Sequence, residues 1–207
     1  MGDFTLPPAS TLIVGMTGSG KSTFAYKYLT HSPAACRFVF DNLGRAGTRL
    51  GIRPCYTARE VELALGARWV LFNPCRMFDD TRAGFRWFCQ WAYDAARRGP
   101  GKKLLLVDEL WQFCTADSIP KELQLVANAG REENLELVTA TQQPELLNPS
   151  LTGAATELIA FRLTHPEGLR VVEKLGADRR AVSALPLGQF FSYDRLHGGP
   201  VRTGRVF

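Results

Sequence analysis

An eight-residue motif near the start of the chain constrains the fold more than any other feature. Residues 15–22 read GMTGSGKS and match the phosphate-binding pattern GxxxxGK[ST] at every fixed position. The apolar run 11–14 before the motif predicts a strand, and 21–29 after its start predicts a helix. Glycines let backbone N–H groups surround phosphate oxygens, and the positive end of a helix dipole adds attraction. The motif therefore predicts an α/β fold in which a phosphate loop joins a strand to a helix, rather than a glycine-rich turn that binds nothing.

The motif also predicts which side chains hold a nucleotide. Lys21 is expected to reach the β- and γ-phosphates and to act in catalysis, and the Ser22 hydroxyl to bind Mg²⁺. The predicted cofactors are therefore ATP and Mg²⁺. The expected nucleotide-binding residues are Gly15, Met16, Thr17, Gly18, Ser19, Gly20, Lys21, Ser22 and Thr23.

A second apolar strand, predicted over 104–107, ends in two acids, Asp108 and Glu109. The carboxyl ends of parallel strands meet at one edge of a sheet, so both carboxylates are expected beside the phosphate loop. Asp108 is expected to hold Mg²⁺ through water. Glu109 is then free to polarise the attacking water as a general base, which favours hydrolysis over transfer to a small molecule.

A third apolar strand, predicted over 135–140, leads into Thr141-Gln142-Gln143-Pro144. An amide at this strand end is able to sense the γ-phosphate and to orient water without adding charge. Gln142 is preferred to Gln143, because the residue before a proline tends to leave regular structure. The alternative is that Gln142 only forms hydrogen bonds with its own loop.

The rest of the chain alternates short apolar runs with helical patterns, which is typical of a parallel sheet covered by helices. Residues 1–207 are predicted to form a single domain, with 41–56 as a loop, and 189–193 and 201–206 as an antiparallel closing pair. The other expected strands are 37–40, 69–72 and 158–163, and the other expected helices are 58–65, 82–98, 120–129 and 166–175.

Composition excludes several classes of protein. The chain is 45% hydrophobic and 22% charged, which argues against disorder and fibrous structure. No window approaches 18 uninterrupted apolar residues, and residues 1–5 lack the pattern of a signal peptide. Five cysteines occur without a CxxC pair, so we expect reduced thiols and a cytoplasmic protein. The net charge of +5 suits a polyanionic partner but is equally explained by solubility.

The ordered motifs resemble those of the FtsK–HerA superfamily of P-loop ATPases. The resemblance rests on the phosphate loop, the Asp108-Glu109 strand end, and Gly130-Arg131 followed by the 141–144 segment TQQP. It continues through FRL at 161–163, PE at 166–167 and LPLGQFF at 185–191. In its small size the chain is most similar to the genome-packaging ATPases of tailless, membrane-containing double-stranded DNA viruses.

This resemblance implies a RecA-like, ASCE-type core: a mostly parallel sheet with helices on both faces and antiparallel strands at its carboxyl-terminal end. It also implies an ATP-hydrolysing translocase that forms a ring, usually a hexamer, and moves double-stranded DNA without regard to sequence. Capsid vertex or portal proteins would be further partners, with the motor in the host cytoplasm or attached to the virion. The alternatives are another export or conjugation motor of the superfamily, a small-molecule kinase and a nucleotide-gated switch. No arginine-rich lid, which a kinase would need, is evident between Glu109 and Gln142.

The resemblance further implies that Arg131, in the Gly-Arg segment, completes the active site of a neighbouring subunit in the ring. Arg162 is the second candidate for this role. The alternative for Arg131 is that it only pairs with Glu132, with Glu133 or with a helix carboxyl end.

Three arginines are candidate DNA contacts. Arg45, Arg49 and Arg53 recur at every fourth position and suggest a flexible basic loop that grips phosphates, or else a solvated surface loop. Trp87 and Trp91 share one helix face, where packing in the core or at a subunit interface is favoured over base stacking.

Overall fold

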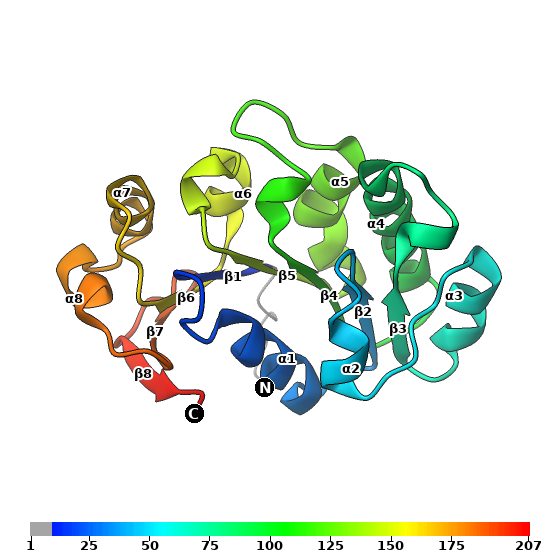
Figure 1. Ribbon diagram of the computed structural model, residues 1–207, viewed down its shortest axis with the longest axis horizontal. Helices are drawn as coiled ribbons and strands as arrows, with labels where there is room; N and C mark the ends of the chain where they lie inside the picture. Colours follow the sequence, from blue (N-terminus) through cyan, green and yellow to red (C-terminus); the bar gives the residue numbers. More distant parts are fainter. Residues whose placement is uncertain (1–9) are drawn as a thin grey trace, which may run out of the picture.

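The apolar runs form the strands of one eight-stranded sheet in the computed structural model, which describes residues 10–207 (Figure 1). The strand order is β3-β2-β4-β5-β1-β6-β7-β8. The strands are β1 (Ser10–Val14), β2 (Cys36–Phe40), β3 (Trp69–Phe72), β4 (Lys103–Asp108), β5 (Leu135–Thr141), β6 (Glu157–Phe161), β7 (Gln189–Asp194) and β8 (Arg202–Arg205).

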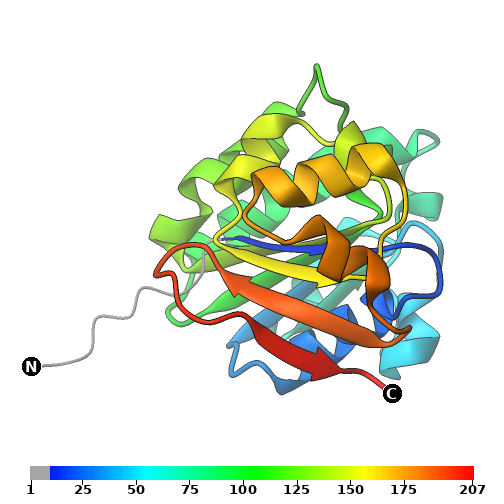
Figure 2. The same cartoon turned by 90° about the vertical axis from the view of Figure 1, so that its left-hand side faces the viewer.

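The first six strands are parallel, and β7 and β8 are antiparallel to their neighbours. Strand β5 lies between β1, which leads into the phosphate loop, and β4, which carries the two acids. This inserted strand and the antiparallel end strands confirm the RecA-like arrangement predicted from sequence. Figure 2 shows β7 and β8 as the outer hairpin of the sheet, with α7 and α8 above it.

Helices cover both faces of the sheet, as Figure 1 shows, with α1 and α2 below it and α4 to α7 above it. Two buried apolar clusters, one on each face, hold the layers together. The helices are α1 (Lys21–His31), α2 (Ala46–Leu50), α3 (Ala58–Leu65), α4 (Thr81–Arg97), α5 (Lys121–Ala129), α6 (Pro149–Ala154), α7 (Pro166–Lys174) and α8 (Arg179–Ala184).

The aromatic face of α4 belongs to the core. Trp91 is only 7% exposed and stacks on Phe88, with 5.6 Å between ring centroids. Trp87 packs on Phe72 and Phe78. Burial of this large aromatic area holds α4 against β2 and β3. The packing interpretation of the two tryptophans is therefore confirmed for this chain.

The structure corrects three sequence expectations. The segment expected as a loop over 41–56 contains the short helix α2, because the Asp41 carboxylate accepts the backbone N–H groups of Arg45 and Ala46 (both 3.0 Å) and starts a turn. Helices α6 and α8 were not expected; side chains of Asn148 and Asp178 cap their first turns. Strand β6 ends at Phe161 instead of Leu163, because the carbonyl of Arg162 turns to accept the N–H of Met16 (2.8 Å).

Two further expectations concern the cell compartment. Within residues 10–207, none of the helices has the length and apolar character needed to cross a membrane. The five cysteines, all within this range, are free thiols. The absence of a signal peptide was judged from residues 1–5, which lie outside the described part of the chain.

Candidate functional site

The phosphate loop leaves the amino end of α1 open for an anion. Gly18 (φ 75°) and Gly20 (φ 112°) adopt left-handed backbone conformations that side-chain-bearing residues rarely tolerate. No side chain caps α1 and no acid lies in its first turn. The first N–H groups of a helix have no intrahelical partner and carry the positive end of its dipole. The loop therefore offers a ring of backbone donors of the kind that binds phosphate.

Lys21 lies buried at the centre of this loop, with only 5% of its surface exposed. Its Nζ donates a hydrogen bond to the Met16 carbonyl (3.1 Å). Burial lowers the pKa of Lys21, and the nearby carboxylates of Glu109 and Asp108 oppose that shift. A buried ammonium group with only one neutral acceptor is suited to an incoming phosphate, which would supply the missing counter-charge.

Ser22 and Asp108 face each other from α1 and the end of β4. The Ser22 hydroxyl donates to Asp108 Oδ2 over 2.8 Å. Hydroxyl and carboxylate oxygens are the ligands that Mg²⁺ accepts, and this ion usually keeps phosphate oxygens and waters as its other ligands. The described residues contain no cluster of three or more His, Cys, Asp or Glu that would hold a metal unaided. The pair fits a magnesium ion that arrives with a nucleotide.

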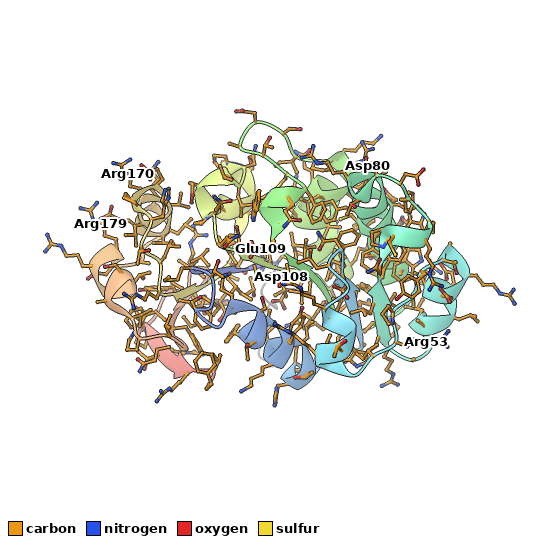
Figure 3. The ribbon with its side chains drawn as sticks, in the orientation of Figure 1. Arg53, Asp80, Asp108, Glu109, Arg170 and Arg179 are labelled. Atoms are coloured by element: carbon orange, nitrogen blue, oxygen red, sulfur yellow. The ribbon has the colours of Figure 1, made fainter. Side chains whose placement is uncertain are left out.

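Glu109 is held in an unusual backbone conformation beside Asp108 (Figure 3). Its φ and ψ of 53° and 51° are left-handed, which is uncommon outside glycine and marks a constrained position. Its Oε2 accepts hydrogen bonds from the Trp111 indole Nε1 (2.9 Å) and the Gln142 backbone N–H (3.4 Å). Oε1 has no hydrogen-bond partner within residues 10–207. One carboxylate oxygen is thus fixed by protein donors while the other is available to a water molecule.

Gln142 joins the phosphate loop to the end of β5. Its side-chain Oε1 accepts a hydrogen bond from the Thr17 hydroxyl (2.5 Å), and its backbone N–H faces Glu109. Gln142 therefore contacts the loop through its side chain and the acid through its backbone. The next residue, Gln143, donates its own N–H back to the Thr141 hydroxyl (3.0 Å) and begins the turn before Pro144.

A cavity of about 310 Å³ opens in front of the loop. Besides the expected residues, its lining includes Tyr26, Asp41, Arg45, Arg49 and Phe207, none of which the sequence had indicated as nucleotide contacts. These residues reach the cavity through the packing of β2, α1 and the chain after β8, which are distant in sequence. No local motif predicts their position there. Asp41 directly follows β2, whose carboxyl end meets the same sheet edge as those of β4 and β5.

The three arginines proposed as one basic loop are separated in the structure. Arg45 and Arg49 line the cavity at the phosphate loop, and the Arg49 guanidinium lies 5.9 Å from the Tyr26 ring centroid. Arg53 lines a different hollow beside α3, and Figure 3 shows it far from Asp108 and Glu109. The expectation of a single basic loop is therefore wrong, because helix α2 interrupts the segment and brings two of the arginines to the cavity at the phosphate loop.

Arg131 lies at the amino ends of the parallel strands, whereas Arg162 lies at their carboxyl ends. Arg131 is in the turn Gly130–Glu133 before β5, whereas Gln142 follows β5, so the two are roughly 20 Å apart along the strand. Glu133 pairs with Arg97 (3.6 Å), and Arg131 forms no ion pair within residues 10–207. Arg162 instead adjoins its own phosphate loop, and its buried Nε has no hydrogen-bond partner in that range. Arg131 thus lies outside the candidate site formed by its own chain.

No protein-family model matches the chain, and no curated protein matches it by sequence. Solved structures do. The genome packaging NTPase B204 from Sulfolobus turreted icosahedral virus 2, in complex with ATP-gammaS, is 19% identical with a TM-score of 0.75, covering 97% of this chain and 99% of that one. A second structure is described as B204, the DNA-packaging ATPase from Sulfolobus Turreted Icosahedral Virus. It is 20% identical with a TM-score of 0.75, covering 97% of this chain and 98% of that one.

A bacterial structure shows a more distant likeness. The cytoplasmic domain of the Thermomonospora curvata Type VII Secretion ATPase EccC is 17% identical with a TM-score of 0.61, covering 96% of this chain and 23% of that one. At these identities the comparisons establish the fold: the chain is built like P-loop ATPases over nearly its whole length. The resemblance to packaging ATPases predicted from sequence is confirmed at the level of the fold.

Proposed function

We propose that this chain is an ATP-hydrolysing motor that moves double-stranded DNA and packages a viral genome into a preformed capsid. The observation that carries the ATPase part is the juxtaposition of the open phosphate loop with Ser22–Asp108 and the Glu109 carboxylate. The genome-packaging part is supported by full-length structural similarity to B204, which its descriptions call a genome packaging NTPase.

The proposed chemistry divides between binding and water activation. Backbone N–H groups of the loop and the Lys21 ammonium would bind the β- and γ-phosphates, and Ser22 with Asp108 would hold Mg²⁺, which supplies charge neutralisation at the phosphates. Glu109 Oε1 would take a proton from the attacking water. Gln142, which already contacts Thr17 of the loop, would respond to the γ-phosphate.

The proposal extends to the assembly. A ring, expected to be a hexamer, would place Arg131 of one subunit at the nucleotide of the next, where an added arginine stabilises charge on the transferring phosphoryl group. Duplex DNA would be bound without sequence preference, and capsid vertex or portal proteins would anchor the motor. Its working location would be the host cytoplasm, with attachment to the virion as a further location.

The likeness to EccC supports one alternative, an export motor of the same fold. A protein-export or conjugation ATPase and a DNA packaging motor would both bind and hydrolyse ATP, so the distinction rests on what stimulates hydrolysis.

The test is the rate of ATP hydrolysis with and without long duplex DNA. We expect stimulation by duplexes of unrelated sequence and a steep loss of DNA affinity with rising salt, since contacts would be made to phosphates. Hydrolysis that is indifferent to DNA would contradict the packaging proposal, and stimulation by a nucleoside or sugar would point to a kinase.

A further inference from the structure

The phosphate loop has a second neighbour that no motif explains, the segment after β8. Val206 and Phe207 lie against the loop on the side away from the acids. The Val206 N–H donates to the Gly188 carbonyl (2.9 Å), the Gly188 N–H donates to the Ser19 carbonyl in the loop (3.0 Å), and Lys27 Nζ donates to the Val206 carbonyl (2.8 Å). These three bonds fix the position of residues 206 and 207 relative to the loop and to α1.

Two glycines make this approach possible. A Cβ on Gly20 would lie 2.7 Å from a methyl carbon of Val206, and one on Gly188 would lie 2.5 Å from the Phe207 ring. Gly188 also has a left-handed φ of 80°. The Phe207 ring therefore rests directly on backbone. It nevertheless remains 63% exposed and lines the cavity in front of the phosphate loop.

An exposed aromatic ring in a nucleotide-sized cavity calls for an explanation, because burying such a ring is favourable and leaving it in water is not. The orientation of the triphosphate provides one. Ser22, Asp108 and Glu109 lie on the β4 side of β1, so a triphosphate bound there would have its magnesium and γ-phosphate on that side. Its nucleoside would then extend to the other side of β1, where β6, β7 and β8 lie and where Phe207 follows β8.

We propose that Phe207 is the stacking surface for the nucleobase of the bound nucleotide. This inference rests on the proposed ATP-binding function and adds a base subsite to it. A phenyl ring has no hydrogen-bond donor or acceptor, so the contact selects by stacked area. Purine triphosphates, ATP and GTP alike, bind better than CTP, and a ligand without a base gains nothing from the ring.

The test compares a ligand that has a base with one that lacks it. Affinities for ATP and for inorganic tripolyphosphate, both with Mg²⁺, are measured by calorimetry in the Glu109→Gln background, where we expect ATP to bind and its hydrolysis to be about 10²-fold or more slower. Base–aromatic stacking predicts that Phe207→Ala weakens ATP binding about 10-fold and leaves tripolyphosphate affinity within about 2-fold. Phe207→Tyr, which keeps the ring, should bind ATP like the parent.

Phe207→Leu separates stacking from packing. Leucine still covers Gly188 but has no ring, so it should lose ATP affinity as alanine does, while the thermal unfolding temperature stays close to that of the parent. Equal weakening of ATP and tripolyphosphate would overturn the proposal, since it would mean that the phosphate loop had shifted. Undiminished ATP affinity in Phe207→Ala would also overturn it. Because binding is measured without hydrolysis or DNA, this result is independent of whether the chain acts as a motor.

Discussion

The Trp111 indole donates a hydrogen bond to Glu109 Oε2 over 2.9 Å, so the acid that we propose as general base is held by a side chain two residues away. The left-handed backbone at Glu109 brings the two side chains together at the start of the turn Leu110–Gln112. The neighbouring Gln112 accepts a hydrogen bond from Asn42 (2.9 Å) at the end of β2. The turn thus ties the acid to a second strand end at the same edge of the sheet.

Trp111→Phe should lower kcat and leave KM for ATP near its parental value. The phenyl ring keeps most of the packing but loses the donor to a carboxylate, a bond whose loss corresponds to about 10- to 100-fold in rate. Steady-state ATPase kinetics measure the split. Trp87→Phe on α4, whose ring packs on Phe72 and Phe78, is the matched control and should leave both constants unaltered.

A double-mutant cycle tests whether Trp111 affects the rate through Glu109. If Trp111 acts by positioning Glu109, adding Trp111→Phe to Glu109→Gln should cost nothing further, because coupled residues are not additive. Multiplicative losses in the double variant would show that Trp111 acts by a different route.

Glu109→Gln should bind ATP with Mg²⁺ but hydrolyse it about 10²-fold or more slowly, since the amide cannot accept the proton of water. Lys21→Ala should lose nucleotide binding or turnover instead, and Asp108→Asn should shift the magnesium titration. Calorimetry for binding and phosphate release for turnover distinguish the three. A parental rate in Glu109→Gln would remove that residue from the role of base.

Arg45→Ala with Arg49→Ala should weaken ATP binding about 10-fold, the order expected for charge-assisted bonds to phosphate, and should leave the salt dependence of DNA binding unaltered. Both side chains line the cavity at the loop, which is the reason for this expectation. Arg53→Ala is the control, because Arg53 lines the hollow beside α3. A shallower DNA salt slope in the double variant, with ATP affinity intact, would restore these arginines to the DNA surface.

Arg131→Ala should assemble and bind ATP but hydrolyse it roughly 10³-fold more slowly, at the lower end of the range for an arginine supplied in trans. Mixing it with Lys21→Ala, whose Arg131 is intact, should restore part of the activity in mixed rings. Absence of recovery in rings shown to be mixed would count against action between subunits. Full activity of Arg131→Ala alone would exclude the residue from the site.

The sequence predicted the parts of the fold and site that depend on local pattern. The phosphate loop, the two acids at the end of β4 and Gln142 after β5 each follow an apolar run. Parallel pairing of these strands brings all three to the carboxyl ends of the strands. Side chains such as Arg49 and Phe207 reach the cavity through packing of α2 against α1 and of Val206 against Gly20. Such contacts join segments distant in sequence, so no spacing of residues encodes them.

Short helices were the least predictable elements. Helices α2 and α8 begin where Asp41 and Asp178 accept backbone N–H groups, and each spans fewer than two full turns. So few residues carry no clear apolar periodicity, and each turn forms because an aspartate a few residues away caps its first backbone N–H groups. The difference matters for the site, because α2 brings Arg45 and Arg49 to the cavity in front of the phosphate loop.

The central claim, that ATP hydrolysis by this chain moves it along duplex DNA, is tested most directly by displacement of a third strand. A triplex-forming oligonucleotide is annealed near one end of a long duplex, and its release is followed with ATP, with a non-hydrolysable analogue, and with the Glu109→Gln variant. We predict release by the parent protein with ATP, on duplexes of unrelated sequence, and no release with the analogue or the variant. A parent protein that hydrolyses ATP in the presence of the duplex but never releases the third strand would contradict the claim.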